Sequence, residues 1–419
     1  MDHELVCQRC GAQHEPGSYP FGCPTCLETD QAGRLEVVLT DRERVDFPPG
    51  DDAESTMWRY RELLPLLADD PVTLGEGWTP LVELSTGAPY THHLKNETVN
   101  PTWSYKDRLN SLLLSNITAL GHAHVVTSST GNHGASTAAY ATHAGVEQTV
   151  VLLHPESDRP HQVQLQAYGA KVAVASDEGR STLLRALAER GWFPTVNVTE
   201  PFSGVPYTLE GYKTVAYELV EQLGESPTFM VCAIGAGDGL YGVWKGFREL
   251  ADLDVIEHTP RMVGVQPAER PSVVKAFEAG ADRVETTPGP MPIATSTSGP
   301  SAGDHTLRAL RESDGIALGI DRSSIRDAIT ETGRSGVFLE PASAMTVAAV
   351  EVLAERGEFD RDDHVVSLGT GAGVKWPSKT GELIGEVPHV GDTLDELVET
   401  LDIDPDAPGR ERPTERINR

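Results

Sequence analysis

The sequence predicts an α/β fold with parallel sheets. Short apolar runs alternate with helical segments of about 10–15 residues, a pattern that is typical of βαβ units. The 419 residues are enough for about two to three domains of ~150 residues each. Four of the five cysteines fall within the first 26 residues, which predicts a separate small unit at the N-terminus.

The N-terminal unit is predicted to bind a metal ion. Cys7 and Cys10 form one CxxC pair, and Cys23 and Cys26 form a second. Four thiolates on two tight turns are the ligand set of a closed, tetrahedral, structural Zn²⁺ site. A redox dithiol and unligated thiols are the alternatives, and His14 is expected at the surface. The polar and acidic residues 27–55 are predicted to be a connector.

The remaining elements follow in alternation. The predicted strands span 124–129, 149–153, 171–175, 229–235 and 364–369. The predicted helices span 131–145, 161–170, 181–191 and 208–223. From about residue 388 the chain is acidic and contains proline, which predicts a peripheral tail.

The charge excludes several function classes. With 34 basic and 63 acidic residues the net charge is −29, so nucleic acids and anionic membrane surfaces are not expected partners. Only eight of the basic residues are lysines, and the acids are scattered, which is typical of a halophilic protein whose surface charges are screened by salt. There is no apolar run of 18 residues and no N-terminal signal pattern, so we expect a cytoplasmic protein without membrane spans.

A glycine-rich loop is a candidate anion site. It consists of Gly235, Ala236, Gly237, Asp238 and Gly239, between a predicted strand and a helix that begins near Leu240. Its backbone N–H groups and the positive end of the helix dipole suit a phosphate. Neither the dinucleotide fingerprint nor the nucleotide P-loop is present, and a turn that merely packs the helix on the strand is the alternative. The carboxylate of Asp238 is expected to point outward or to cap the helix.

Three further segments carry candidate chemistry. Lys106 is predicted to begin a helix, where a partly desolvated amine can form a Schiff base; an ordinary surface lysine is the alternative. Residues Ser128–Asn132 offer hydroxyls, an amide and helix N–H groups to a carboxylate. Thr370 follows a late strand and can hydrogen-bond a heteroatom. Helix capping and turn formation are the alternatives for both loops.

Taken in order, these segments resemble the fold-type II pyridoxal-phosphate enzymes, most closely the threonine synthase family. The resemblance spans about residues 70–380. It rests on LGEGWTPL (74–81), NPTWSYKDR (100–108), SSTGNHGAS (128–136), YTLEGYKT (207–214), AIGAGDGLYGVWKGFREL (233–250), GVFLEPASA (336–344) and VVSLGTGAGVK (365–375).

The resemblance implies a tryptophan synthase β-like fold, with two αβα domains and a small N-terminal zinc ribbon. The ribbon and connector would span 1–45, and an acidic tail would span 389–419. A large cofactor-binding domain would comprise 46–91 and 193–388, and a small domain, 92–192, would be inserted into it and close over the substrate.

The resemblance also implies roles for individual residues. Lys106 would bind pyridoxal 5′-phosphate covalently and act as the general base, and residues 235–239 would hold the cofactor phosphate. Asn132 would meet the 3′ oxygen of the cofactor ring, and Thr370 its ring nitrogen. Ser129, Thr130, Gly131 and Asn132 would take the carboxylate of an amino-acid substrate. Members of this superfamily are often dimers, which makes a homodimer the expected assembly.

The chain departs from the family pattern near the candidate site. Trp103 replaces a glycine, Tyr105 a phenylalanine and Tyr212 a glutamine, and Thr208 stands where an arginine usually contributes to binding the substrate phosphate. An indole at 103 is expected to fill space near the active centre, and Arg108 or Lys245 could replace the lost cation.

Three functions stay open at this point. The first is conversion of O-phospho-L-homoserine to threonine. The second is a paralogue that acts on another amino acid, as a threonine or serine ammonia-lyase or a β-replacement synthase. The third is a catalytically inactive zinc-ribbon regulatory protein.

Overall fold

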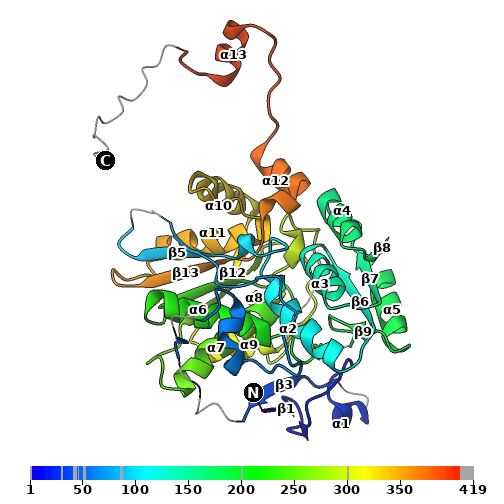
Figure 1. Cartoon of the computed structure of the whole chain (residues 1–419). Helices are drawn as coiled ribbons and strands as arrows, with labels where there is room; N and C mark the ends of the chain where they lie inside the picture. Colours follow the sequence, from blue (N-terminus) through cyan, green and yellow to red (C-terminus); the bar gives the residue numbers. More distant parts are fainter. Residues whose placement is uncertain are drawn as a thin grey trace, which may run out of the picture.

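The computed structural model describes residues 2–29, 32–40, 45, 47–50, 53–84, 88–199, 202–299 and 302–405. Three sheets organise this part of the chain: one of three strands, one of six and one of four (Figure 1). The predicted α/β fold with parallel sheets is confirmed. Among the described residues, no helix has the length and apolar character needed to cross a bilayer.

The N-terminal unit is a small antiparallel sheet with one short helix. Its strands lie in the order β2 (Gln13–His14), β1 (His3–Cys7) and β3 (Leu35–Leu39), and α1 spans Pro24–Leu27. Strand β3 lies inside the predicted connector 27–55, so that part of the prediction is wrong. Alternate side chains of β3, beginning with Leu35, are buried, but this short alternation is hard to recognise among acidic neighbours. Residues 41–44 of the connector lie outside the described residues.

The six-stranded sheet is the frame of the large domain. Its strands, in sheet order, are β12 (Ile316–Ile320), β11 (Arg261–Pro267), β10 (Phe229–Ala233), β13 (His364–Gly369), β5 (Thr91–Asn96) and β4 (Leu81–Glu83). All pairs are parallel except β4 with β5. One face packs against α6 (Lys213–Leu223), α7 (Asp238–Asp252), α8 (Ser272–Glu278) and α9 (His305–Glu312). The other packs against α10 (Arg322–Arg334) and α11 (Pro341–Glu355) (Figure 1).

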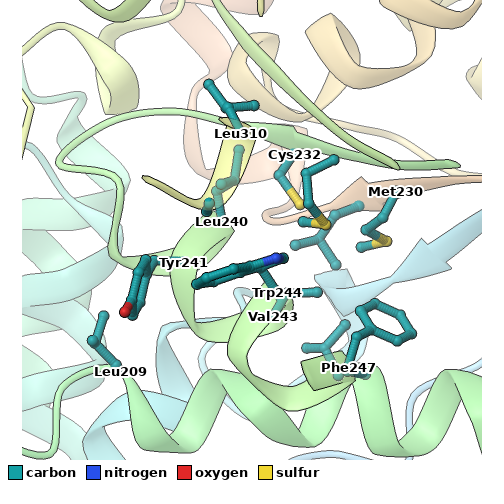
Figure 2. Packing of buried hydrophobic residues seen from close by; sticks show 14 of the residues in the cluster. Leu209, Met230, Cys232, Leu240, Tyr241, Val243, Trp244, Phe247 and Leu310 are labelled. Atoms are coloured by element: carbon teal, nitrogen blue, oxygen red, sulfur yellow. The ribbon is translucent and has the colours of Figure 1, made fainter. Parts of the chain in front are cut away.

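Strand β10 shows why the central strands are unbroken apolar runs in the sequence. Met230 and Cys232 pack with α7, whereas Phe229 and Val231 pack on the opposite face with α11. Because helices cover both faces, every residue of β10 is buried and the usual polar alternation is absent. Figure 2 shows Met230 and Cys232 in one cluster with side chains of α7.

The four-stranded sheet forms the small domain. Its strands, in sheet order, are β8 (Lys171–Val174), β7 (Gln148–Leu153), β6 (His124–Ser129) and β9 (Phe193–Pro194), all parallel. Its helices are α3 (Asn132–His143), α4 (Arg159–Ala167) and α5 (Asp177–Ala188). Val151 and Leu153 of β7 pack toward α3 and α4, while Leu152 packs toward α5, so helices cover both faces.

Sheet membership bears on the domain boundaries. The range 92–192 contains β5, which pairs with β13 of the large sheet, and it excludes β9, which pairs with β6 of the small sheet. We propose that the inserted domain begins near residue 97 and ends near residue 196. The helix α2 (Lys106–Ala119) packs against α3 and also against η4 (Glu210–Tyr212), and so links the two domains.

All the predicted strands and helices are present. Those over 124–129 and 364–369 coincide with β6 and β13, and the others have shifted ends. The helix predicted over 208–223 is α6, but it begins at Lys213 and is preceded by the 3₁₀ turn η4. The helix expected to begin near Leu240 is α7, which begins at Asp238. The described part of the chain also contains the short 3₁₀ helices η2 (Met57–Leu63), η3 (Glu97–Val99), η5 (Thr295–Thr297) and η6 (Gly373–Lys375).

Helix α7 crosses the start of α6 and the residue before η4 at a short distance. A Cβ atom on Gly242 would lie 2.6 Å from the carbonyl oxygen of Leu209, and one on Gly246 would lie 2.6 Å from that of Lys213. Only glycine allows the backbones to approach this closely.

The C-terminal segment lies at the periphery. Helix α12 (Pro377–Ile384) packs against α10, and α13 (Leu394–Leu401) has no buried residue and lies apart from the rest of the molecule in Figure 1. The end of the predicted tail, from residue 406, is outside the described residues.

The cluster on α7 makes a test of the core possible. Phe247 is fully buried beside Trp244 (Figure 2), and Phe247→Ala removes a ring from a close-packed interior. We expect the free energy of unfolding to fall by about 3–5 kcal/mol, measured by urea titration. Val387 is 86% exposed, and Val387→Ala is the matched control, with an expected change within ~0.5 kcal/mol. Equal effects of both substitutions would contradict the packing described here.

Candidate active site

A cavity of about 370 Å³ lies between the two domains. Lys106, the glycine loop, the loop after β6 and Thr370 all contribute to its lining. The structure therefore brings together candidate residues that are up to 264 positions apart in the sequence, from Lys106 to Thr370. Of the residues predicted to bind the cofactor or the substrate, Gly131 alone is not part of the lining that the structure describes.

Lys106 is the first residue of α2, as the sequence predicts. Its Nζ donates to the hydroxyl of Tyr212 at 2.9 Å and lies 3.4 Å from that of Tyr105. The two tyrosine rings stack with centroids 4.6 Å apart, and the Nζ lies over both ring faces. Among the described ion pairs none involves Lys106, and it is the one lysine in the described lining, so its amine is available to a ligand.

The neighbours of Lys106 hold its loop in place. Asp107 accepts hydrogen bonds from the backbone N–H (2.7 Å) and the hydroxyl (2.6 Å) of Thr102, and burial raises the pKa of its carboxyl to about 6. Arg108 is fully buried and pairs with Glu97 and Glu218. The backbone N–H of Tyr105 donates to the carbonyl of Thr370, which ties this loop to the residue that follows β13.

Two expectations about neighbouring residues are wrong. Trp103 does not fill space near the cavity: it is 47% exposed, with a left-handed φ of 64°, because its loop turns the indole outward. Arg108 and Lys245 cannot supply a free cation either. Arg108 is committed to its two carboxylates, and Lys245 pairs with Glu210 at 2.6 Å.

The glycine loop lies between β10 and α7, as predicted, and two of its three glycines are required by close neighbours. Gly237 has φ 97°, and a Cβ there would collide with the hydroxyl of Thr306. A Cβ on Gly239 would lie 2.7 Å from the hydroxyl oxygen of Tyr105. A Cβ on Gly235 would lie in ordinary contact with the carbonyl oxygen of Ser296, at 3.7 Å, so the space at this position does not require glycine. The loop is thus a backbone-lined cup at the positive end of a 15-residue helix.

The expectation that Asp238 points outward or caps α7 is wrong, because its carboxylate is paired inside the protein. Its Oδ1 lies 2.9 Å from Nη2 of Arg34 and 3.2 Å from Nε2 of His305. Burial alone would raise the pKa of Asp238, but Arg34 and His305 together hold it well below its usual range. Both partners come from distant segments and were not singled out from the sequence.

The loop after β6 combines helix capping with a buried acceptor that has no partner among the described residues. The hydroxyl of Ser129 accepts from the backbone N–H groups of Gly131 (2.9 Å) and Gly134 (3.0 Å), so this side chain caps α3. Asn132 donates to Glu340 at 2.8 Å, while its Oδ1 is buried without a partner among the described residues. His133 forms a hydrogen bond with the hydroxyl of Thr195, and burial lowers the pKa of its imidazole to about 3, so it is a neutral residue of the first turn of α3.

Thr370 and Glu340 complete this side of the cavity. The hydroxyl groups of Thr370 and Ser343 are 2.9 Å apart, and Ser296 donates to Glu340 at 3.1 Å. Burial raises the pKa of Glu340. Glu340 lies in the motif GVFLEPASA, but the sequence analysis assigns it no role. A charged residue directly before Pro341, at the start of a buried helix, is the signal that could have identified it.

The far wall of the cavity carries two arginines that the sequence analysis did not identify. Arg180 of α5 donates to the hydroxyl of Ser128 at 2.8 Å and pairs with Asp177. Arg270, which follows β11, donates three hydrogen bonds to the carbonyl oxygens of Gly289 and Ser298. A guanidinium has five N–H groups, so Arg270 keeps two for a ligand.

The four cysteines of the N-terminal unit form a tight cluster. Their sulfur atoms all lie within 4.8 Å of one another, with 3.7 Å between Cys7 and Cys26 and 3.8 Å between Cys10 and Cys23. A tetrahedron of thiolates around Zn²⁺ at ~2.3 Å has edges of ~3.8 Å. His14 is not a simple surface residue: its Nε2 lies 3.3 Å from Cys23 Sγ.

The residues of the cavity fit pyridoxal phosphate. A lysine amine without a described ion pair, a glycine cup at a helix N-terminus and the amide of Asn132 face the same cavity. The oxygen of that amide is buried without a partner among the described residues. The three features respectively suit an aldehyde, a phosphate group and a polar ring substituent.

Comparison with known proteins gives a consistent picture. Residues 72–371 match the family model of pyridoxal-phosphate dependent enzymes. The chain is 30% identical over 410 residues to a threonine synthase of Methanosarcina acetivorans, covering 95% of this chain and 98% of that one. It is 31% identical to a threonine synthase of Methanocaldococcus jannaschii, covering 88% and 92%. A threonine deaminase of Solanum lycopersicum shares the fold, with a TM-score of 0.63 at 19% identity over 82% of this chain and 97% of that one.

Proposed function

Because the chain belongs to the pyridoxal-phosphate-dependent enzyme family, we propose that it is a lyase of the threonine synthase type. Its reaction would convert O-phospho-L-homoserine and water to L-threonine and phosphate. The observation that carries this proposal is the shared cavity, in which Lys106, a phosphate cup and two arginines face one space. The sequence similarity to threonine synthases extends over almost the whole chain and supports the same assignment.

The cofactor would occupy the side of the cavity next to the glycine loop. The backbone of 235–239 would hold its phosphate, Asn132 would meet its 3′ oxygen, and Thr370 would meet its ring nitrogen. Bound pyridoxal phosphate withdraws electrons from the substrate and makes the Cα proton removable. A hydroxyl such as Thr370, already paired with Ser343, leaves that ring nitrogen largely unprotonated.

Lys106 would move the Cα proton. Once its Nζ is free, it is the amine in the cavity that can accept this proton and return it. The hydroxyl of Tyr212, 2.9 Å away, keeps the Nζ directed toward the cavity. Lys375 is a poor rival: burial lowers its pKa to about 8, but its Nζ donates to the carbonyl of Thr102, and the residue is not part of the cavity lining that the structure describes.

The substrate would lie between the β6 loop and the two arginines. The first-turn N–H groups of α3, with Thr130 and Asn132, would take its carboxylate. Thr208 cannot replace an arginine, since its hydroxyl donates to the carbonyl of Val205. We propose that Arg180 and Arg270 take the substrate phosphate instead. Asp177, which now pairs with Arg180, is 68% exposed and can turn to solvent when the phosphate arrives.

A second function is favoured by Thr208 alone. Without the usual arginine, a substrate that lacks phosphate, such as L-threonine, would bind equally well, and the enzyme would be an ammonia-lyase. Product analysis separates the two functions when the holoenzyme receives each substrate alone in molar KCl. Threonine and phosphate from O-phospho-L-homoserine support the synthase. 2-Oxobutyrate from L-threonine, with no product from the phosphorylated substrate, would overturn it.

The assignment of Lys106 predicts the effect of Lys106→Ala. The variant should lose turnover by at least about a thousandfold, because both the attachment point and the base are removed. It should also lose the visible absorbance band of a lysine-bound cofactor. Lys171 is exposed on β8, and Lys171→Ala is the control that should keep both signals. Full activity of Lys106→Ala would contradict the assignment.

The assignment of the phosphate site predicts a selective effect of Arg270→Ala. The KM for O-phospho-L-homoserine should rise about tenfold or more, because charge-assisted hydrogen bonds contribute roughly 1.5–3 kcal/mol. The cofactor absorbance should be retained. Arg283 is exposed, so Arg283→Ala serves as the control. If KM stays the same in Arg270→Ala, the substrate phosphate lies elsewhere.

We also propose that the four cysteines hold a structural Zn²⁺. Cys7→Ser should lower the zinc content to well below one ion per chain and reduce the thermal stability. Cys232 is a buried cysteine outside the cluster, and Cys232→Ser should leave the zinc content as it is in the wild type. Metal analysis by mass spectrometry measures both. Wild-type protein without zinc would refute the site.

A further inference from the structure

The cup proposed for the cofactor phosphate contains a carboxylate of its own. Asp238 is the first residue of α7 and belongs to the cavity lining. A carboxylate at this place offsets the positive potential at the N-terminus of the helix and would repel a phosphate a few ångströms away. The loop can bind an anion only if the charge of Asp238 is neutralised by another group.

Arg34 supplies the neutralising charge. Its side chain is buried, with 7% exposed, and its Nη2 lies 2.9 Å from Oδ1 of Asp238. His305 lies between them: its Nδ1 is 3.3 Å from Nη1 of Arg34, and its Nε2 is 3.2 Å from Oδ1 of Asp238. A guanidinium only donates, so Nδ1 of His305 accepts and Nε2 carries the hydrogen. Burial lowers the pKa of His305, so the full positive charge is that of Arg34.

The backbone at Arg34 is fixed by the two cysteine turns of the N-terminal unit, which is called the four-cysteine unit below. A Cβ on the preceding residue, Gly33, would lie 2.7 Å from Sγ of Cys26 and 2.8 Å from Sγ of Cys7. The backbone N–H of Cys23 donates to the carbonyl of Gly33 at 2.8 Å. Gln8, which follows Cys7, donates to the carbonyl of Arg34 at 2.9 Å. The position of the guanidinium therefore depends on the conformation of both cysteine turns.

Strand β3 carries these contacts to the large domain. Lys245 of α7 donates to the carbonyl of Val37 at 2.6 Å, and Tyr241 of α7 donates to Glu36 at 2.9 Å. Arg308 of α9 lies 3.6 Å from Glu36. Figure 1 shows the N-terminal sheet beside α7 and α9. The N-terminal unit is thus seated on the helix whose first turn forms the cup.

We propose that Arg34 is a positioning residue for cofactor binding: it neutralises Asp238, and through it the four-cysteine unit sets the affinity of the glycine loop for the cofactor phosphate. This inference rests on the proposed function in one respect, the location of the cofactor phosphate at residues 235–239. It assigns to the N-terminal unit a role in the active site that its distance along the sequence does not suggest.

The test measures the dissociation constant of pyridoxal phosphate for the cofactor-free full chain, from the quenching of tryptophan fluorescence. Arg34→Ala should weaken binding about tenfold or more, because Asp238 is left as an unpaired carboxylate. The double variant Arg34→Ala/Asp238→Asn should restore most of the affinity. A merely structural role of Arg34 would not be rescued by a change of charge on α7, so a double variant as weak as Arg34→Ala would overturn the proposal.

Arg308→Ala is the matched control. It removes a cation that also contacts the N-terminal unit but that has no contact with Asp238 among the described residues. Its dissociation constant should stay within about threefold of the wild type. An effect as large as that of Arg34→Ala would mean that docking of the unit, and not the charge on Arg34, sets the affinity, and would overturn the proposal.

The coupling to the cysteines is tested in two backgrounds. Cys7→Ser should weaken cofactor binding in the wild-type chain and have little further effect in Arg34→Ala/Asp238→Asn, where Arg34 no longer acts. An equal weakening in both backgrounds would overturn the coupling. Failure of the proposed function looks different: wild-type protein that does not bind pyridoxal phosphate refutes that function, whereas tight binding that Arg34→Ala leaves unchanged refutes this inference alone.

Discussion

The position of Lys106 depends on the ion pairs of Arg108, two residues further along the chain. Arg108 is fully buried and contacts Glu97 and Glu218 with both edges of its guanidinium. Lys95 also pairs with Glu218, at 2.7 Å, so two cations and two carboxylates form a neutral buried cluster. Such a cluster contributes little net stability, but loss of one member would leave an uncompensated charge and cost several kcal/mol. Its geometry thereby fixes the start of α2 against the large sheet.

The sequence predicts the fold correctly where helices bury both faces of a strand and where the helices themselves are amphipathic. Strands such as β10 and β13 are continuous apolar runs, because helices cover both faces of the sheet, and such runs stand out from the acidic remainder of the chain. Strand β3 was missed because only alternate residues are buried within a polar segment. The 3₁₀ turn before α6 was missed because the packing of Glu210–Tyr212 against α2 sets it, and local propensity does not.

The site was predictable where its chemistry is local, and not where it depends on distant partners. The lysine, the glycine loop and Thr370 each lie at the end of a strand or the start of a helix, so their segments carry the signal. Arg34 and Arg270 belong to segments without a motif. Arg34 pairs with Asp238, 204 residues further along the chain. Arg270 enters the candidate site only through its place in a cavity lined by both domains. Trp103 shows the opposite error: a large side chain near a motif was expected to fill the cavity, but a left-handed backbone turns it to the surface.

The charges inside the cavity and those on the surface act over different ranges. A protein with net charge −29 repels an anionic substrate at low salt. At molar salt the Debye length is ~3 Å, so scattered surface carboxylates contribute little at the cavity entrance. Arg180 and Arg270 line the cavity and would contact a bound phosphate directly, at a distance that salt screens much less. Arg108, Lys213 and Lys245 are committed to buried carboxylates, so the guanidinium groups that can meet an anion in the described cavity lining are those of Arg180 and Arg270. An acidic surface and recognition of an anionic substrate are therefore compatible in this chain, provided that the recognising cations lie inside the cavity.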